Sequence, residues 1–253
     1  MNSRKLFSQL WPLALVFLIA GLGSCTVVNA NIPTNSPTNT STPPDYNRWL
    51  RKQPCAAPCW EGITPGVTTY KDALHILAQN KFFWKVESHL PDGITWKWRG
   101  TKYPGVAIFD ASLTTPVLDS ITADSPDHIK LKDVTAVFGY PDYVEVFAEP
   151  GTDIGSGMDY MMDFYYLQSG LDLRIMQGGN IPPPQISPET LVNEVIFFAS
   201  SLDGLYRMKG WHDPNASDLF RQELLPWQGT LDFDKYCKLY YGAKADFHCQ
   251  LQP

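Results

Sequence analysis

The sequence predicts an α+β fold, built as a tandem repeat of one helix plus about four antiparallel strands, with the helices packed on one sheet face. Two segments with the apolar spacing of amphipathic helices echo each other, one beginning at Thr69 and the other at Lys130. Each is followed by short strand-like runs that turn residues separate. Antiparallel strands in this arrangement bury one face beneath the helix and leave the other free.

Residues 1–24 have the pattern of a bacterial lipoprotein signal. Arg4 and Lys5 precede an apolar run over 10–22, which is short for a membrane span of about 20 residues. The run ends in Leu-Gly-Ser followed by Cys25, which resembles the lipobox whose cysteine receives diacylglyceryl. We therefore expect a signal peptide over 1–24 and an extracytoplasmic protein, anchored to the bacterial membrane through lipid on Cys25, on its cell-surface or periplasmic side. An uncleaved anchor and an ordinary secretory signal are the alternatives.

The rest of the chain divides by composition into a linker and a folded part. Residues 25–44 are rich in Asn, Thr, Ser and Pro, and they have too few large apolar groups to bury a core, so we expect a disordered linker. Residues 45–253 are expected to form a single α+β domain. Its first repeat covers about 60–124, its second about 125–199, and a C-terminal extension covers 200–253.

Four cysteines follow Cys25, and an even number in an exported chain favours disulfides. Short loops close most readily, so we expect two local pairs, while cross-links between the two ends of the domain are the alternative. A zinc site with His248 is disfavoured because neither end carries a Cys-x-x-Cys pair. The candidate disulfide residues are Cys55, Cys59, Cys237 and Cys249.

The first predicted helix begins at Thr69, whose spacing from Asp72 resembles a capping box. Strand-like runs follow at 82–88, 94–98, 105–111 and 117–122. The apolar residues of the helix share one face at i, i+3, i+4 and i+7: Tyr70, Ala73, Leu74 and Leu77.

The second predicted helix follows Lys130, a poor cap, and ends at Gly139 and Pro141. Strand-like runs follow at 142–147, 160–167, 171–176 and 191–199, with Ser169-Gly170 as a tight hairpin turn. The apolar spacing of the first helix recurs here: Leu131, Val134, Thr135 and Phe138. In the C-terminal extension, the aromatic residues indicate packing against the domain: Trp211, Trp227, Phe233, Tyr236 and Tyr240.

Charge and motifs exclude some functions. Removing Arg4 and Lys5 from the 20 basic residues leaves 18 against 26 acidic ones, a net charge near −8. This balance argues against nucleic acid and against electrostatic docking to anionic lipid. Ser156 lacks the Gly-x-Ser-x-Gly spacing of a nucleophile elbow, and the aspartates over 153–163 lack the pattern of a calcium loop. We therefore expect that the protein is not an enzyme and that it has no catalytic, cofactor-binding or metal-binding residues.

Aromatic residues give a stronger signal, since they make up 13% of the chain. Between 158 and 167, both faces of the predicted strand are largely apolar. In such a strand, either both faces are covered by other parts of the protein or one apolar face stays exposed. Rigid aromatic rings are common at binding surfaces. We therefore hypothesise that the helix-free sheet face binds a ligand through this strand. The residues proposed for the binding face are Tyr160, Met162, Phe164 and Tyr166.

Residues 55–69 resemble a recurring segment of uncharacterised bacterial lipoproteins, in which Pro-Cys-Trp, Gly-Ile, Pro-Gly and Thr-Thr precede an amphipathic helix. The segment 132–142 resembles the second half of the sequence in the same family. The resemblance covers most of 55–200 and implies no activity. At the level of the fold, the duplication resembles the β-lactamase inhibitor protein, and the helix start at 66–69 resembles the small lipoproteins of outer-membrane assembly. These resemblances imply binding rather than catalysis.

The expected function is therefore that of a membrane-anchored extracytoplasmic lipoprotein, a non-catalytic binding module for a protein or cell-envelope component. The first alternative is a carbohydrate-binding surface protein with a polysaccharide ligand. The second is a hydrolase whose site carries no recognisable motif.

Overall fold

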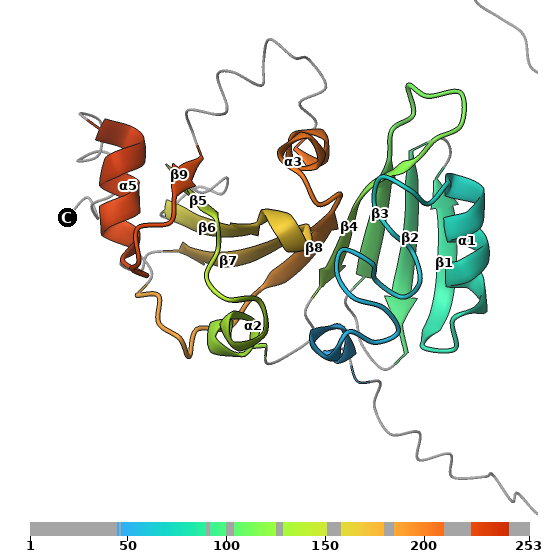
Figure 1. The fold of residues 1–253 in the computed structure, drawn as a ribbon, viewed down its shortest axis with the longest axis horizontal. Helices are drawn as coiled ribbons and strands as arrows, with labels where there is room; N and C mark the ends of the chain where they lie inside the picture. The colour runs from blue at the N-terminus through green and yellow to red at the C-terminus, as the bar shows by residue number, and fades with distance from the viewer. Residues whose placement is uncertain are drawn as a thin grey trace, which may run out of the picture. The chain divides into compact units, whose positions relative to one another are not determined.

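The computed structural model describes residues 45, 47–89, 92–99, 104–124, 129–150, 158–179, 185–209 and 224–242. Within them, nine strands form one sheet in the order β1-β2-β3-β4-β8-β7-β6-β5-β9 (Figure 1). All neighbouring strands in this sheet are antiparallel. The fold is α+β, as the sequence predicts. The expected signal peptide and linker lie outside the described residues, as does Trp211.

The first half of the sheet follows the predicted order of one helix and four strands. A short 3-10 helix, η1 (Arg48–Arg51), precedes α1 (Tyr70–Gln79). The four strands are β1 (Phe83–His89), β2 (Gly93–Trp98), β3 (Pro104–Phe109) and β4 (Leu118–Asp124), and their bounds lie close to the predicted ones.

The second half has the same order. After α2 (Leu131–Phe138) come β5 (Tyr143–Pro150), β6 (Met158–Tyr166), the 3-10 turn η2 (Leu167–Ser169), β7 (Leu171–Gly179) and β8 (Glu194–Phe198). The predicted two-residue turn at Ser169-Gly170 is too short, because the connection from β6 to β7 covers the four residues 167–170. Gly170 ends it with φ of 57°, and a Cβ there would clash with the Phe198 carbonyl oxygen. The extension adds α3 (Leu202–Met208), β9 (Leu225–Pro226) and α5 (Phe233–Tyr241).

The starts of α1 and α2 make matching backbone contacts. Thr69 bridges Val117 on the approach to β4, and Lys130 bridges Leu191 on the approach to β8. In each case, the first helical amide donates to the carbonyl just before the bridge partner, at 3.0 Å for α1 and 2.9 Å for α2. Each helix start is therefore tied to the approach to the fourth strand of its own half.

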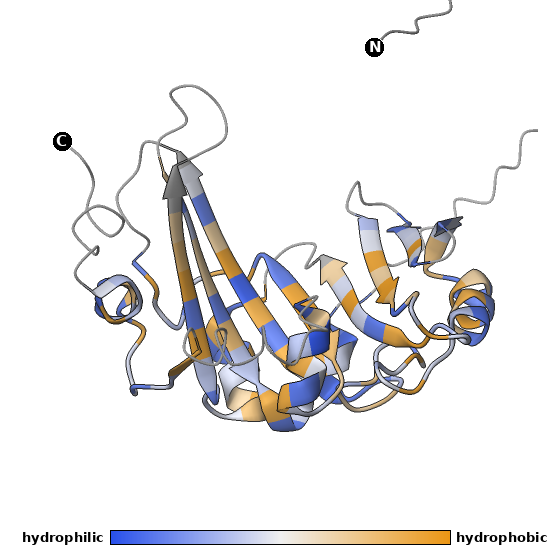
Figure 2. Ribbon diagram, turned by 90° about the horizontal axis from the view of Figure 1, so that it is seen from above, coloured by the Kyte–Doolittle hydropathy of each residue, from blue (hydrophilic) through white to orange (hydrophobic). Residues whose placement is uncertain are grey.

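One face of the sheet, which we call the helix-layer face, carries α1, α2 and α5 over a shared core. Successive side chains of a strand point to opposite faces, and Figure 2 shows the resulting alternation of hydrophobic and hydrophilic bands along the strands. Trp96 and Trp98 are buried on this face, with the Trp60 ring centroid 5.0 Å from that of Trp96. The helices contribute buried residues to the core: Ala73, Leu77, Leu131, Val134, Phe233 and Tyr236.

The two predicted helices, α1 and α2, pack on the helix-layer face, whereas α3 of the extension, which was not predicted as a helix, packs on the other. Leu205 and Tyr206 of α3 form a separate core with Tyr165 and Phe198, on the face that we call the α3 face. In Figure 1, α3 lies above β6–β8 and α2 lies below them. The physical reason is that the second side of the sheet also carries large apolar side chains, Tyr165 of β6 and Phe198 of β8, which need a cover.

The two outer strands of the sheet differ. β9 pairs with β5 through only two residues, Leu225 and Pro226. β1 lies at the opposite end of the strand order and carries Lys85 and Glu87, both exposed, whose side chains form an ion pair at 2.6 Å. Charges on such a strand discourage pairing with a further strand.

Candidate functional site

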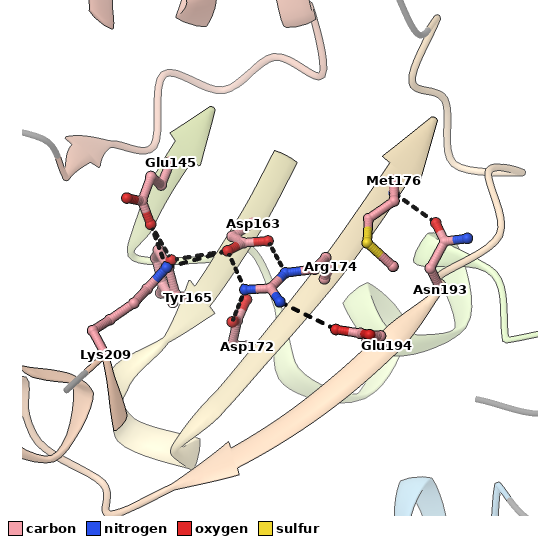
Figure 3. Close-up of polar contacts among 9 residues, drawn as sticks. All are labelled: Glu145, Asp163, Tyr165, Asp172, Arg174, Met176, Asn193, Glu194 and Lys209. Carbon is pink, nitrogen blue, oxygen red and sulfur yellow. Dashed lines mark hydrogen bonds and ion pairs between the residues drawn. The ribbon is translucent and has the colours of Figure 1, made fainter. Parts of the chain in front are cut away.

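A row of four charged residues crosses the α3 face, one residue from each of four neighbouring strands. Glu145 of β5 lies opposite Asp163 of β6, which lies opposite Arg174 of β7, and Arg174 lies opposite Glu194 of β8. Figure 3 shows their side chains converging above the sheet, and we call them the charged row. Glu145 and Asp163 are buried, while the side chains of Arg174 and Glu194 are 21% and 24% exposed.

Arg174 is the centre of this row because it contacts three carboxylates. Its guanidinium donates to Asp163 in a bidentate arrangement, with Nε–Oδ1 at 2.9 Å and Nη2–Oδ2 at 3.0 Å. Nη1 donates to Glu194 Oε2 at 3.2 Å, and Nη2 lies 4.0 Å from Asp172 Oδ2. Burial alone would lower the pKa of Arg174, but these carboxylates raise it above its ordinary value, so the guanidinium stays charged.

Lys209 brings a second cation to the charged row from the residue that follows α3. Its Nζ donates to Glu145 Oε2 at 2.6 Å and to Asp163 Oδ2 at 3.3 Å. Burial would lower the pKa of Lys209, but the carboxylates of Asp163 and Glu145 raise it overall. The end of α3 is therefore held against the sheet by charge as well as by its apolar side.

Two further groups beside the row, Tyr165 and Asp172, have raised pKa values. The Tyr165 hydroxyl donates to Glu145 and, at 3.2 Å, to Asp163 Oδ2. Burial and the negative charge of Asp163 raise the pKa of Tyr165 well above its usual range. Asp172 is fully buried, and neither of its oxygens has a hydrogen-bond partner among the described residues. Burial, followed by the charge of Asp163, raises the pKa of Asp172 well above its usual range and favours a protonated carboxyl.

A hollow opens on the α3 face beside the charged row. Phe147, Met161 and Met176 lie directly opposite one another on β5, β6 and β7. They line a cavity of about 480 Å³, together with Asp159 and Gly178, and we call it the methionine hollow. Met176 is 41% exposed, and its backbone amide donates to Asn193 Oδ1 at 2.7 Å (Figure 3). The site therefore combines an open apolar surface with neighbouring carboxylates.

The hypothesis that Tyr160, Met162, Phe164 and Tyr166 form an open binding face is wrong. All four are buried on the helix-layer face, where α2 and α5 cover them. The Tyr160 ring packs edge-on against Phe233 of α5, with centroids 5.6 Å apart. Because neighbouring strand residues face opposite sides, the α3 face of β6 carries the odd-numbered residues. Asp159 and Met161 line the hollow there, while Asp163 and Tyr165 are buried.

The cysteines agree with local pairing where the structure describes them. Cys55 and Cys59 form a disulfide. Cys237 is also disulfide-bonded, and its partner lies outside the described residues, as do Cys249 and the candidate lipidation residue Cys25.

The sequence interpretation missed every member of the charged row except Asp163, which it considered only for calcium. One signal was present, because Asp163, Asp172 and Arg174 interrupt strands that are otherwise apolar. Counting outward from the predicted two-residue turn would have placed Asp163 opposite Met176, whereas the four-residue connection 167–170 places it opposite Arg174. The contributions of Glu145 and Lys209 depend on contacts between segments far apart in the chain.

The described residues contain no group of three or more His, Cys, Asp or Glu side chains placed to hold a metal ion. None of the helices in the same part of the chain has the length and apolarity needed to cross a membrane.

Comparison of the chain with family models, curated proteins and solved structures finds no match.

Proposed function

We propose that this chain is a lipid-anchored, extracytoplasmic binding module without catalytic activity. We propose that it binds a protein of the cell envelope on its α3 face. The observation that carries the proposal is the methionine hollow, an open apolar row formed by Phe147, Met161 and Met176. Thioether side chains adapt their shape to a partner, and an aromatic ring provides rigid contact area. An apolar hollow bordered by polar groups is a common form of binding site.

The charges around the hollow define the chemistry of the partner. Asp159 borders it, and the charged row beside it has more carboxylates than cations. The whole chain has a net charge of −6. A partner that inserts an apolar side chain flanked by Lys or Arg would match this surface.

The tandem repeat is part of the same proposal. Its support is the matching pair of helix starts, in which Thr69 and Lys130 make equivalent bridges toward the fourth strand of each half. The strand order adds support, because β1 to β4 and β5 to β8 run toward each other and meet at the β4–β8 pair. The resemblance to duplicated binding proteins then favours a binding role by analogy.

Lipidation of Cys25 is the second part of the proposal, and it rests on the lipobox-like sequence. Replacing the thiol in Cys25→Ser is expected to move the protein from the membrane pellet to the soluble extracytoplasmic fraction, because the acyl chains supply the anchor. Fractionation and mass spectrometry of the N-terminal peptide measure this. An unmodified Cys25 in the wild-type protein would contradict the proposal, and Ser24→Ala, which keeps a small residue, serves as the control.

Placing a charge in the methionine hollow tests the proposed surface. Met176→Glu is expected to reduce cross-linking to the envelope partner at least 10-fold, because a carboxylate would be desolvated beside existing acids. Quantitative mass spectrometry after chemical cross-linking in intact cells gives the readout.

Ile108→Glu is a matched control, since Ile108 is 43% exposed and lies on a strand of the other half of the sheet. A partner that is captured equally by wild type, Ile108→Glu and Met176→Glu would rule out the methionine hollow as its site. Retention of the wild-type protein on immobilised polysaccharide would instead favour the carbohydrate alternative.

A further inference from the structure

Trp84 differs from the other described tryptophans because it is 56% exposed. It is an extra residue in the first pairing of β1, since the register with β2 shifts between Phe83 and Lys85. Such a bulge redirects a side chain, and here a large ring is left in solvent. The remaining tryptophans that the structure describes are buried or half-buried: Trp49, Trp60, Trp96, Trp98 and Trp227.

Lysines surround this exposed ring. Lys97 of β2 lies opposite Lys85, and its Nζ is 6.0 Å from the centroid of the Trp84 ring. Lys81 is also exposed, and its Nζ is 5.4 Å from the centroid of the Phe82 ring. We call these five residues the Trp84 corner. The corner combines aromatic rings with cations, in contrast to the acidic balance of the whole chain.

The folded part of the chain begins beside this corner. The first described residue is Asp45, and the guanidinium carbon of Arg48 in η1 lies 4.4 Å from the centroid of the Phe82 ring. Trp49 fixes η1 in the core, because its ring stacks on that of Phe138 with centroids 5.8 Å apart. In Figure 1, η1 and the arrowhead of β2 lie at the same, lower end of the first half of the sheet. A tether that precedes Asp45 therefore joins the domain next to the Trp84 corner.

The length of the expected linker favours contact between this end of the domain and the bilayer. Residues 25–44 would span about 25 Å on average as a flexible coil. A domain of this size is about 40 Å wide, so the side that the linker joins is the one held closest to the membrane. Tethering also raises the local concentration to about the millimolar range, so a weak contact is sufficient. This step rests on the lipid at Cys25 in the proposed function.

We propose that the Trp84 corner contacts the surface of the membrane that carries the lipid anchor, with the Trp84 ring in the headgroup layer. Tryptophan favours this layer because its ring is apolar and its indole N–H can donate to a polar group. Lys85 is already paired with Glu87, so Lys97 is the cation best placed to meet a lipid phosphate. The net charge of −6 does not prevent the contact, because charges farther away than about 10 Å are largely screened.

The test couples the mature chain, from Cys25 onward, to a maleimide lipid in vesicles of phosphatidylglycerol and brominated phosphatidylcholine. Mass spectrometry of the N-terminal peptide confirms that the lipid is on Cys25. Bromine quenches tryptophan fluorescence on contact, so wild type should be quenched and Trp84→Phe should lose this quenching. Because the lipid is attached chemically, the result does not depend on whether cells acylate Cys25.

A relocated ring provides the matched control. Leu239 of α5 is 53% exposed and lies in the other half of the fold, so Trp84→Phe/Leu239→Trp moves an equally accessible tryptophan away from the corner. This double variant should show no quenching by the brominated lipid. Lys97→Glu should reduce the quenching of Trp84 at least about two-fold, because it reverses a charge that faces the lipid phosphates. Lys238→Glu, at an exposed position of α5, should leave the quenching unchanged.

An unquenched wild type would overturn the inference, as would equal quenching of wild type and Trp84→Phe/Leu239→Trp, or equal effects of Lys97→Glu and Lys238→Glu. If a second copy covers the corner instead, quenching of Trp84 by acrylamide will fall as the concentration of lipid-free chain rises, which would also overturn it. Trp84→Phe should cross-link to the envelope partner like wild type, since the methionine hollow lies in the other half of the sheet. An unmodified Cys25 in cells would contradict the proposed anchor without altering the result with vesicles.

Discussion

Replacing Arg174 by Met is expected to lower the free energy of unfolding by about 3–5 kcal/mol, because it removes the cation at the centre of a buried ionic network. Asp163 would lose its bidentate partner, and Glu194 would lose its hydrogen bond with the guanidinium. Met keeps much of the length of the side chain, so the loss reports the charge rather than a cavity. Urea unfolding at neutral pH measures the difference.

The control for this change is the exposed ion pair on β1. Lys85→Met removes a cation that lies 2.6 Å from Glu87, but both side chains are more than 40% exposed, so the expected loss is below about 1 kcal/mol. The double variant Asp163→Asn/Arg174→Met should recover part of the stability, because it also removes a stranded negative charge. Equal effects of Lys85→Met and Arg174→Met would show that the charged row is not a stabilising network.

Asp172→Asn is expected to make the protein more stable than wild type at neutral pH. Asp172 has a raised pKa in the folded state, so the folded protein holds a proton that the unfolded chain releases above about pH 4. Wild-type stability therefore falls as the pH rises from about 4 toward the folded-state pKa, by about 1.4 kcal/mol per pH unit for one proton. Asn carries no such proton, so the variant lacks this part of the slope.

The comparison isolates Asp172 from its charged neighbours, which titrate in both proteins. The groups that face it are Glu145 of β5, Asp163 and Tyr165 of β6, Arg174 of β7, and Lys209 after α3. Unfolding free energies of wild type and variant at pH 4, 5, 6 and 7 should be similar at pH 4 and diverge above it. A difference that stays constant across this range would contradict a raised pKa of Asp172.

The strands could be predicted because their cues are local. Alternating apolar residues and turn residues define each run, and Gly170 can adopt the positive φ that the hairpin needs. The helices of the extension were harder to predict from the sequence, since α3 and α5 are both short. Their caps were nevertheless present in the sequence, because Ser201 accepts from the Gly204 amide and Asp232 from the Lys235 amide.

The site could not be predicted in the same way, because it depends on register and on which face is covered. Both faces of β6 carry large apolar side chains, so alternation alone cannot tell whether Phe164 or Tyr165 points toward the helix layer. Packing of α5 decides which face of β6 is covered, because Phe233 of α5 lies against Tyr160. In the sequence, α5 is separated from β6 by β7, β8, α3 and β9. Lys209 reaches Glu145 from an equally distant part of the chain, a contact that no local pattern specifies.

The outer strand β1 has a consequence for molecules held close together on a surface. If β1 of one copy pairs with β1 of a second copy, attraction requires Lys85 of each copy to lie opposite Glu87 of the other. Placing Lys85 opposite Lys85, or Glu87 opposite Glu87, brings like charges together. Few alignments of two such edges are therefore favourable. Copies that lie side by side are therefore not expected to pair through β1 into a continuous intermolecular sheet.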